Sequence, residues 1–460
     1  MGTCASQFYS NDTEKQTLAR RIAPTDEQIS SQQEYWNDLA YYLKSDLRSR
    51  SGYPITSWIQ GSYKFATQIR PARKGLEYDI DLGVYFAWKG RPNEGSHSAV
   101  DLKAMVQHSL TAYAEDAETD ASSVTDPKEF CSRIRFSEDF HIDVPAYHEW
   151  DDVRHLASES EGFVDRDPYT IWAWWIDTFE EQERARARRM VRYIKMWAAL
   201  KFDEKTENTP SSILLTVLIA YAYSSIDLAS KSGDDEVFGA LISQIVADLD
   251  ASNSGSVSNP VDPDENLNRM GDDFASFEER LATLSKICER ALQADDAASA
   301  AAIWSEAFGH FFPLPAEEKL VEASGSLSKS LVAAFVPDVS IEITLPTGKS
   351  YMLRNAAPNV PKGSTLKFLL ANYANAPFGS LVSWVVRNEG EAAEAKNDLG
   401  HFSGYGETPA VETAEYRGRH FMDVTIIASG RVVGLRRVPV SVISNSVVRA
   451  AAKRLFRTKR

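Results

Sequence analysis

Two aspartates separated by one residue carry the clearest chemistry in the sequence. Asp79 and Asp81 lie in a segment, residues 77–86, whose alternation of apolar and polar residues is typical of a strand. Successive side chains of a strand point to opposite faces, so the two carboxylates project to the same face. A carboxylate pair that substrate phosphates complete is the kind of oxygen site that Mg²⁺ accepts. The segment therefore predicts a magnesium site.

A third aspartate extends this site. Asp143 lies in residues 140–144, which show the same alternation. A third carboxylate on a neighbouring strand allows two metal ions ~4 Å apart, one activating an attacking hydroxyl and one stabilising a pyrophosphate leaving group. We predict that Asp79, Asp81 and Asp143 are the catalytic and metal-binding residues. The expected cofactor is Mg²⁺, as two ions, with Mn²⁺ as a substitute.

Gly61 and Ser62, upstream of the aspartates, predict a phosphate-binding turn. Glycine lets the backbone approach a phosphate, and the serine hydroxyl and neighbouring N–H groups can bind its oxygens. An Asp-x-Asp pair alone is more often a solvent-exposed feature than a metal site. The ordered combination of Gly61-Ser62, the aspartate pair and Asp143 is more specific, and it indicates chemistry on a nucleotide phosphate.

The elements that must position these residues are a helix and several strands. Thr25 and Gln28 form a capping-box pattern before a long amphipathic helix. A second helix is expected over residues 99–117. Residues 133–136 and 140–145 are predicted to form a hairpin, with residues 137–139 as its turn.

The second half of the chain changes character twice. Residues 165–320 are mostly helical, with a helix start at Pro210-Ser211-Ser212 and a polar loop over residues 248–264. Short β runs divided by Gly, Pro and Asn turns then follow. They are residues 339–345, 351–354, 381–387, 421–427 and 431–440.

The chain is therefore predicted to be α+β with several domains, as its 460 residues suggest. We expect a catalytic lobe with its N-terminal helix over residues 1–164 and a helical lobe over residues 165–323, which by the family resemblance given below would complete a nucleotide cleft. A β-rich domain over residues 335–445 and a basic tail over residues 446–460 follow.

Composition narrows the class of protein. The net charge of -15 argues against a protein that coats nucleic acid through general electrostatics. Three scattered cysteines fit neither a disulfide framework nor a zinc ribbon and indicate a reducing, cytoplasmic location. Since no apolar run approaches the ~20 residues that span a bilayer, no integral membrane contact is expected.

The ordered set Gln60-Gly61-Ser62, residues 77–82 and residues 141–145 resembles the polymerase β-like nucleotidyltransferases. More closely, it is similar to the CD-NTase family, which includes cyclic GMP-AMP synthase and DncV-like enzymes. The resemblance covers about residues 25–320 and implies a mixed sheet with helices plus a helical lobe. It also implies that the donor nucleotide is bound by Gln60, Gly61, Ser62, Lys195 and one of Ser211 and Ser212.

The resemblance implies an enzyme, a nucleotidyltransferase of the cyclic oligonucleotide synthase type. Its activity would be template-independent synthesis of a cyclic di- or oligonucleotide second messenger from NTPs, in bacterial antiphage signalling, with a downstream effector protein that responds to the product. Two alternatives within the same chemistry remain open: a linear oligonucleotide product, and nucleotidyl transfer to another acceptor. An alternative of another class is a non-catalytic sensor that binds RNA or a partner.

The β-rich region resembles the adenylyl/guanylyl cyclase and SMODS-associated C-terminal sensor type, AGS-C, through residues 384–390 and 412–420. This resemblance implies an RNA or protein ligand there. Arg133 and Arg135 alternate onto one strand face, and a contact with the acceptor nucleotide is a further hypothesis.

Three histidines recur every seven residues. They are His141, His148 and His155. Pro145 prevents one continuous helix, so the spacing does not place them on a common helical face. We interpret them as ordinary hydrogen-bonded histidines.

Overall fold

The computed structural model describes residues 2–13, 16–116, 118–136, 140–252, 255–313, 335–406, 409–428 and 431–444. The chain forms two compact units. Unit 1 comprises Met1–Arg21, Ala229–Ser243 and Glu279–Arg460. Unit 2 comprises Ile22–Leu228 and Gln244–Glu278.

Unit 2 is built around a mixed sheet with the strand order β3-β4-β5-β2-β6-β7-β8, to which β1 adds by pairing with β2. The central strand β2 runs parallel to both β5 and β6. The predicted hairpin is confirmed, because β4 pairs antiparallel with β5. The strands are β1 (Ile55–Gln60), β2 (Tyr78–Ala87), β3 (Ala121–Val124), β4 (Ser132–Phe136), β5 (Phe140–Val144), β6 (Ala146–Trp150), β7 (Val153–Ser158) and β8 (Gly162–Val164).

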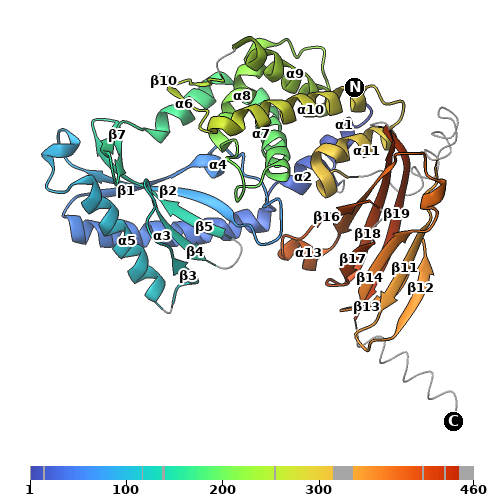
Figure 1. The fold of residues 1–460 in the computed structure, drawn as a ribbon. Coiled ribbons are helices and arrows are strands. Elements are labelled where there is room, and N and C mark those ends of the chain that lie inside the picture. Colours follow the sequence, from blue (N-terminus) through green and yellow to red (C-terminus); the bar gives the residue numbers. More distant parts are fainter. Residues whose placement is uncertain are drawn as a thin grey trace. The chain divides into compact units, whose positions relative to one another are not determined.

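Two long helices, α3 (Asp26–Ser51) and α5 (Ala99–Glu115), pack on this sheet (Figure 1). The capping box is confirmed: the Thr25 side chain accepts from the Gln28 backbone N–H, and the Gln28 side chain accepts from the Thr25 N–H. Leu39, Leu43 and Leu47 recur every four residues and are fully buried. Such spacing presents one apolar stripe, which joins the sheet core.

The rest of unit 2 is mainly helical. The region predicted to be mostly helical begins with two helices, α6 and α7, which Phe179 and Glu180 separate. A short hairpin occupies part of the predicted polar loop. The elements are α4 (Gly61–Lys64), η1 (Pro92–Glu94), α6 (Pro168–Thr178), α7 (Glu181–Lys201), α8 (Ser212–Ser225), β9 (Ser258–Asn259), β10 (Asp262–Asn266) and η2 (Gly271–Asp273). The chain passes between the units within α2 (Leu18–Ile22), α9 (Asp234–Ser252) and α10 (Phe274–Leu292), and also between Leu228 and Ala229.

The N-terminal segment belongs to unit 1. Phe8, at the end of α1 (Ala5–Phe8), is fully buried, and its ring centroid lies 4.7 Å from that of Trp304 and 5.4 Å from that of Phe312. Trp304 lies on α11 (Ala297–Phe308), and η3 (Gly309–Phe311) follows. Cys4 is also fully buried, so this thiol has no access to solvent.

The C-terminal part of unit 1 is a sandwich of two sheets, with the orders β12-β11-β14-β17 and β13-β19-β18-β15-β16. Apolar residues of both sheets share one core. All five predicted β runs are strands. The elements are β11 (Val339–Thr344), β12 (Ser350–Arg354), β13 (Ala357–Pro361), β14 (Thr365–Leu370), η4 (Tyr373–Asn375), β15 (Leu381–Asn388), α13 (Glu391–Ala395), β16 (Gly400–Tyr405), β17 (Ala410–Thr413), β18 (Gly418–Ala428) and β19 (Arg431–Ile443).

The α+β prediction is confirmed by this combination of a mixed sheet, helices and a β-rich C-terminal part. The four predicted domain boundaries remain a prediction, and the basic tail over residues 446–460 lies outside the described residues. Within the described ranges, every helix is too short or too polar to traverse a lipid bilayer.

Candidate active site

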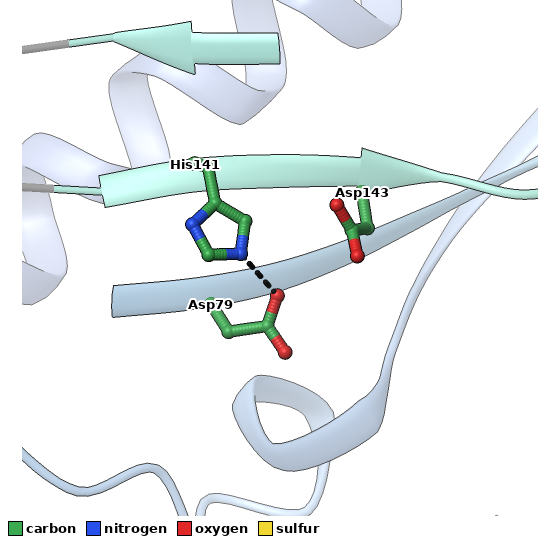
Figure 2. A group of neighbouring side chains, drawn as sticks. All are labelled: Asp79, His141 and Asp143. Carbon is green, nitrogen blue, oxygen red and sulfur yellow. Dashed lines mark ion pairs between the residues drawn. The ribbon is translucent and has the colours of Figure 1, made fainter. Parts of the chain in front are cut away.

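The strand register of unit 2 brings the predicted aspartates together. β2 and β5 are parallel neighbours, with Asp79 opposite His141 and Asp81 opposite Asp143. Residues in register on adjacent strands share a face, so all three carboxylates lie on one face of the sheet. Figure 2 shows Asp79, His141 and Asp143 directed toward one another from β2 and β5.

Asp79, His141 and Asp143 form a group that can hold a metal ion, with one ligand atom from each within 4.8 Å of the others. The His141 Nε2 atom lies 3.0 Å from Asp79 Oδ1, and His141 Nδ1 lies 2.7 Å from Glu77 Oε2. The Asp79 side chain is 55% exposed, so an incoming ion or substrate can reach it. His141 is thus hydrogen-bonded, as expected, and it also belongs to the group that could hold a metal ion, a role that its sequence pattern did not indicate.

Asp143 is held in place by two cations. Arg133 binds it through two hydrogen bonds, Nε to Oδ1 at 2.5 Å and Nη2 to Oδ2 at 2.8 Å, and Lys128 Nζ lies 3.3 Å from Oδ2. Burial opposes ionisation of Asp143, but these cations outweigh it, and the pKa of Asp143 is lowered. Its carboxylate is therefore charged and oriented.

Asp81 is in the opposite electrostatic situation. Burial, together with the negative charges of Asp79 and Asp143, raises the pKa of Asp81 to about 8. A divalent cation among these carboxylates would remove this penalty, because it replaces repulsion with attraction. The donor set therefore fits a hard metal ion with oxygen ligands.

Gly61 approaches the Asp81 carboxylate too closely for any side chain. Its φ is +58°, a left-handed conformation that favours glycine, and a Cβ atom there would lie 1.8 Å from Asp81 Oδ2. The backbone at the start of α4 thus borders the carboxylate group. Ser62 follows on α4 and is half-buried.

Gln60 has a supporting place in the structure. Its Nε2 donates to the Tyr85 hydroxyl at 2.8 Å, and its Oε1 accepts from the Tyr147 hydroxyl at 3.1 Å. The side chain is buried, and these two tyrosines stack with ring centroids 4.9 Å apart. Gln60 therefore fixes β1 where it leads into Gly61.

Three cations on α7 hold the turn that follows α4. Arg188 Nε donates to the Phe65 carbonyl at 3.0 Å, Arg192 Nη2 to the Ala66 carbonyl at 2.7 Å, and Lys195 Nζ to the Thr67 hydroxyl at 3.2 Å. Residues 188, 192 and 195 have the i, i+4, i+7 spacing of one helix face. We name this set the α7 basic row. It contacts residues 65–67, which follow α4 and the predicted phosphate turn at Gly61-Ser62.

The positive charges of the α7 basic row are not fully balanced by neighbouring negative charges. Burial lowers the pKa of Lys195 to about 7 and that of Arg192 to about 10, and in each case a neighbouring arginine adds to the effect. Asp81 and Asp79 oppose the shift of Lys195, so this lysine lies within electrostatic reach of the metal group. The Arg192 Nε atom is buried without a hydrogen-bond partner. Such a row favours an anionic ligand.

The two predicted serines differ in their local contacts. Ser211 is the N-cap of α8, and its hydroxyl accepts from the Leu214 N–H at 3.2 Å, whereas Ser212 is the first helical residue and is exposed. In the described part of the chain, neither serine is hydrogen-bonded to the three aspartates. The cap role alone explains Ser211.

The structure therefore brings together the three aspartates, Gly61 and Lys195. Sequence reasoning missed the contributions of Arg188 and Arg192. The signal in the sequence was the helical spacing of these basic residues. Because the position of residues 65–67 was unknown, the same spacing was equally consistent with a solvent-exposed helix face. Arg133, for which a contact with the acceptor nucleotide is a hypothesis, binds Asp143.

The site combines oxygen ligands for a metal, a glycine turn and a buried row of cations. Transfer of a nucleotidyl group requires a positioned metal, contacts with phosphate and stabilisation of charge, and these features can provide them. The protein is a nucleotidyltransferase. Residues 55–147 match the family described as Cyclic GMP-AMP synthase DncV-like, nucleotidyltransferase domain, and residues 331–443 match the Adenylyl/Guanylyl and SMODS C-terminal sensor domain. These two segments thus match the DncV-like nucleotidyltransferases among the CD-NTases and the AGS-C-type sensor domains.

Relatives extend along the whole chain. A cyclic GMP-AMP synthase of Escherichia albertii is 28% identical over 458 residues, which cover 99% of each chain. A c-di-GMP synthase of Roseivirga ehrenbergii is 27% identical over 259 residues, 50% of this chain and 64% of the relative. The fold is similar to that of Escherichia coli DncV in its 3'-deoxy GTP bound form, with a TM-score of 0.56, 18% identity, and coverage of 67% of this chain and 97% of that chain.

Proposed function

We propose that this chain joins NTPs into a cyclic dinucleotide or short cyclic oligonucleotide, without a template, by metal-dependent nucleotidyl transfer. The observation that carries the proposal is the carboxylate group on β2 and β5 next to a buried row of cations on α7. The Escherichia albertii and Roseivirga ehrenbergii relatives are named as synthases of cyclic dinucleotides, which supports the product class.

Asp79, Asp81 and Asp143 would hold the metal, in our proposal two Mg²⁺ ions, with Mn²⁺ as a substitute. When bound, the ions lower the pKa of the attacking hydroxyl and stabilise charge on the pyrophosphate leaving group. The family uses divalent metals, and the Asp79-His141-Asp143 group suits such an ion. His141 keeps Asp79 oriented through its contacts with that carboxylate and with Glu77.

The donor NTP would bind between the turn at Gly61 and the α7 basic row. Gly61 lets the backbone lie directly against the Asp81 carboxylate, where a side chain would clash, and Ser62 supplies a hydroxyl. Lys195 would bind the triphosphate in its ammonium form, because the phosphate charge restores the proton affinity that burial removes. Arg192 has an unpaired Nε–H available in the same row.

Arg133 would act as the residue that orients Asp143. Its two hydrogen bonds fix both carboxylate oxygens, so the direction in which Asp143 presents its lone pairs depends on this arginine. The same contacts neutralise part of the negative charge that accumulates on β2 and β5. A contact of Arg133 with acceptor nucleotide would require it to release Asp143.

The proposal is tested by incubating the full chain with labelled NTPs and Mg²⁺, then analysing products by mass spectrometry with each of the four bases. We expect a product whose mass equals two or more nucleotides without terminal triphosphate. The matched pair of variants is Asp81→Asn, at the site, and Asp262→Asn, an exposed aspartate of unit 2. Equal product from both variants would overturn the assignment of the site.

Treatment with phosphatase separates the cyclic from the linear alternative. A cyclic product has no terminal phosphate and resists the enzyme, whereas a linear oligonucleotide loses its 5′ phosphates. Labelled nucleotide recovered on a protein or small acceptor would instead support transfer to another acceptor. A role in antiphage signalling, an effector protein that binds the product, and an RNA or protein ligand of the C-terminal domain remain predictions from the family.

A further inference from the structure

A buried lysine on α5 holds the segment that reaches the third aspartate of the site. Lys103 is 4% exposed. Its Nζ donates to the Lys128 carbonyl and to the Glu129 carbonyl, both at 2.7 Å, and lies 2.9 Å from Glu159 Oε2. An ammonium group has three protons, and each of them finds an acceptor here. A lysine is seldom buried without such partners. Lys103 therefore fixes the backbone of residues 128 and 129.

The connection from β3 to β4, residues 125–131, is held at two further points. One turn after Lys103 on α5, Gln107 Nε2 donates to the Thr125 carbonyl at 2.8 Å. Within the connection, the Lys128 N–H donates to the Cys131 carbonyl at 2.9 Å. The helix α5 therefore sets the place from which the Lys128 side chain extends.

The Lys128 side chain brings a positive charge to the third aspartate. Its Nζ lies 3.3 Å from Asp143 Oδ2, and the side chain is 46% exposed. Arg133 makes the closer contact with the same carboxylate, through hydrogen bonds of 2.5 Å and 2.8 Å. The Lys128 ammonium and a metal ion at Asp143 would carry charges of the same sign and repel each other. Lys128 thus opposes the attraction that the carboxylates exert on a metal ion.

We propose that Lys103 is a positioning residue that limits the metal affinity of the site by holding the Lys128 ammonium against Asp143. The inference rests on the metal-binding role proposed for Asp143. Mg²⁺ in sites of this kind is held partly by substrate phosphates. A limited affinity of the protein alone therefore couples metal binding to the arrival of an NTP, whose phosphates supply the remaining ligands and negative charge.

The affinity is measured on the NTP-free full chain by calorimetric titration with Mn²⁺, so the readout does not depend on activity. Lys128→Met removes the ammonium and should tighten Mn²⁺ binding by about three- to tenfold, because one partly screened repulsion is lost. Lys103→Met removes the donor to both carbonyls and should change the affinity in the same direction. A merely structural role of Lys103 would weaken Mn²⁺ binding or leave it unchanged.

Two control variants match these changes. Gln107→Met also removes a donor from α5 to the same connection, but at Thr125, whose N–H is held by the Arg133 carbonyl. Lys44→Met removes an exposed lysine of α3. Both should leave the Mn²⁺ affinity unchanged. Thermal unfolding verifies that each variant is folded, and Lys103→Gln, which also removes the charge, takes the place of Lys103→Met if that variant does not fold.

The double variant shows whether Lys103 acts through Lys128. In the Lys128→Met background, Lys103→Met should have no further effect on Mn²⁺ affinity, because the ammonium that it positions is already absent. Additive effects of the two substitutions, or an unchanged or weakened affinity in Lys128→Met, would overturn the proposal. Asp81→Asn separates this failure from that of the proposed function. If the unmodified chain binds Mn²⁺ no better than Asp81→Asn, the metal site itself is wrongly assigned.

Discussion

Each unit contains a cluster of charged side chains on a sheet, and the two clusters differ in how their charges are balanced. In unit 1, Asp423 accepts from Arg387 and Arg437, and Arg387 also donates to the carbonyls of His310 and Phe312. Arg387 and Asp423 are 4% and 3% exposed, so this cluster is closed to solvent. Its polar groups are satisfied within the protein.

The unit 2 cluster is satisfied only in part. Asp143 has Arg133 and Lys128, whereas Asp81 is raised in pKa to about 8 by burial and by Asp79 and Asp143. Asp423, although buried, has a lowered pKa because its two arginines outweigh burial. A balanced buried cluster stabilises one arrangement of the chain, and an unbalanced one marks a place where a ligand must supply the missing charge.

The largest effect on activity is expected from replacing aspartates of the unbalanced cluster in unit 2. We expect Asp79→Asn combined with Asp81→Asn to reduce product formation by at least about 10³-fold, since metal and transition-state charge lose their ligands. The melting temperature without metal should stay unchanged or rise, because like-charge repulsion is removed. Product assays and calorimetry check both parts, with Asp262→Asn as control. A large fall in melting temperature would mean that the aspartates are structural.

The balanced cluster should respond in the opposite way. Arg387→Leu leaves Asp423 with one cation and removes a donor from the carbonyls of His310 and Phe312, of which His310 keeps a hydrogen bond from Arg21. We expect it to lower the free energy of unfolding of the β-rich part by about 3–5 kcal/mol. Denaturant unfolding measures the change. Arg417→Leu, at an exposed position, is the matched control. An equal effect of both variants would contradict the role assigned to the cluster.

The pH dependence of this stability has a fixed sign. The pKa of Asp423 is lower in the folded than in the unfolded chain, so its contribution is present above the unfolded value and is lost as pH falls toward the folded value. In Arg387→Leu, the free energy of unfolding should therefore decrease less as the pH is lowered.

The aspartate pair shows what the sequence could predict of the site. Asp79 and Asp81 share a face because of the two-residue period of a strand, a local property that needs no tertiary information. Asp143 required the pairing of β2 with β5, which was proposed and which the register confirms. The contact of Gly61 with Asp81 is also non-local, but the glycine itself was a visible signal.

The histidines show where the sequence was insufficient. The seven-residue spacing was compared with the period of a helix, but the three histidines lie on strands, so strand pairing determines their neighbours. His148 and His155 are cross-strand partners on β6 and β7, while His141 is opposite Asp79. The register of parallel strands depends on packing between distant segments, so no local pattern reveals it.

The fold was predictable to a similar degree. The five β runs predicted in the C-terminal part are long or strongly alternating. The strands β13, β14, β16 and β17 were missed; β13 contains two prolines and pairs in parallel with β19. Strands of this kind owe their existence to a neighbouring strand rather than to their own pattern.

Substitutions in the α7 basic row, whose positive charge a bound NTP would balance, should reduce activity less than the loss of the aspartates. Lys195→Gln and Arg192→Gln should each raise the KM for NTP by about 10- to 100-fold, because each removes a charge-assisted contact with phosphate. Steady-state kinetics with saturating metal measure the change. Lys44→Gln on α3, an exposed lysine of the same unit, should leave KM unchanged. A row that serves only to hold residues 65–67 would change stability and leave KM nearly constant.

The pH dependence of NTP binding gives the finest test. Burial lowers the pKa of Lys195 to about 7 in the empty site, so the ammonium form that binds phosphate is lost as pH rises above that value. At pH values above about 7, the KM for NTP should therefore increase by up to about tenfold per pH unit, and Lys195→Arg should flatten this increase.

The lowered pKa of Lys195 has the opposite effect on the stability of the unliganded chain. Since the unfolded lysine holds its proton to higher pH, the free energy of unfolding of the unliganded chain should increase from about pH 7 upward, and Lys195→Gln should remove that increase. A KM that falls with rising pH would show that Lys195 is not the phosphate contact.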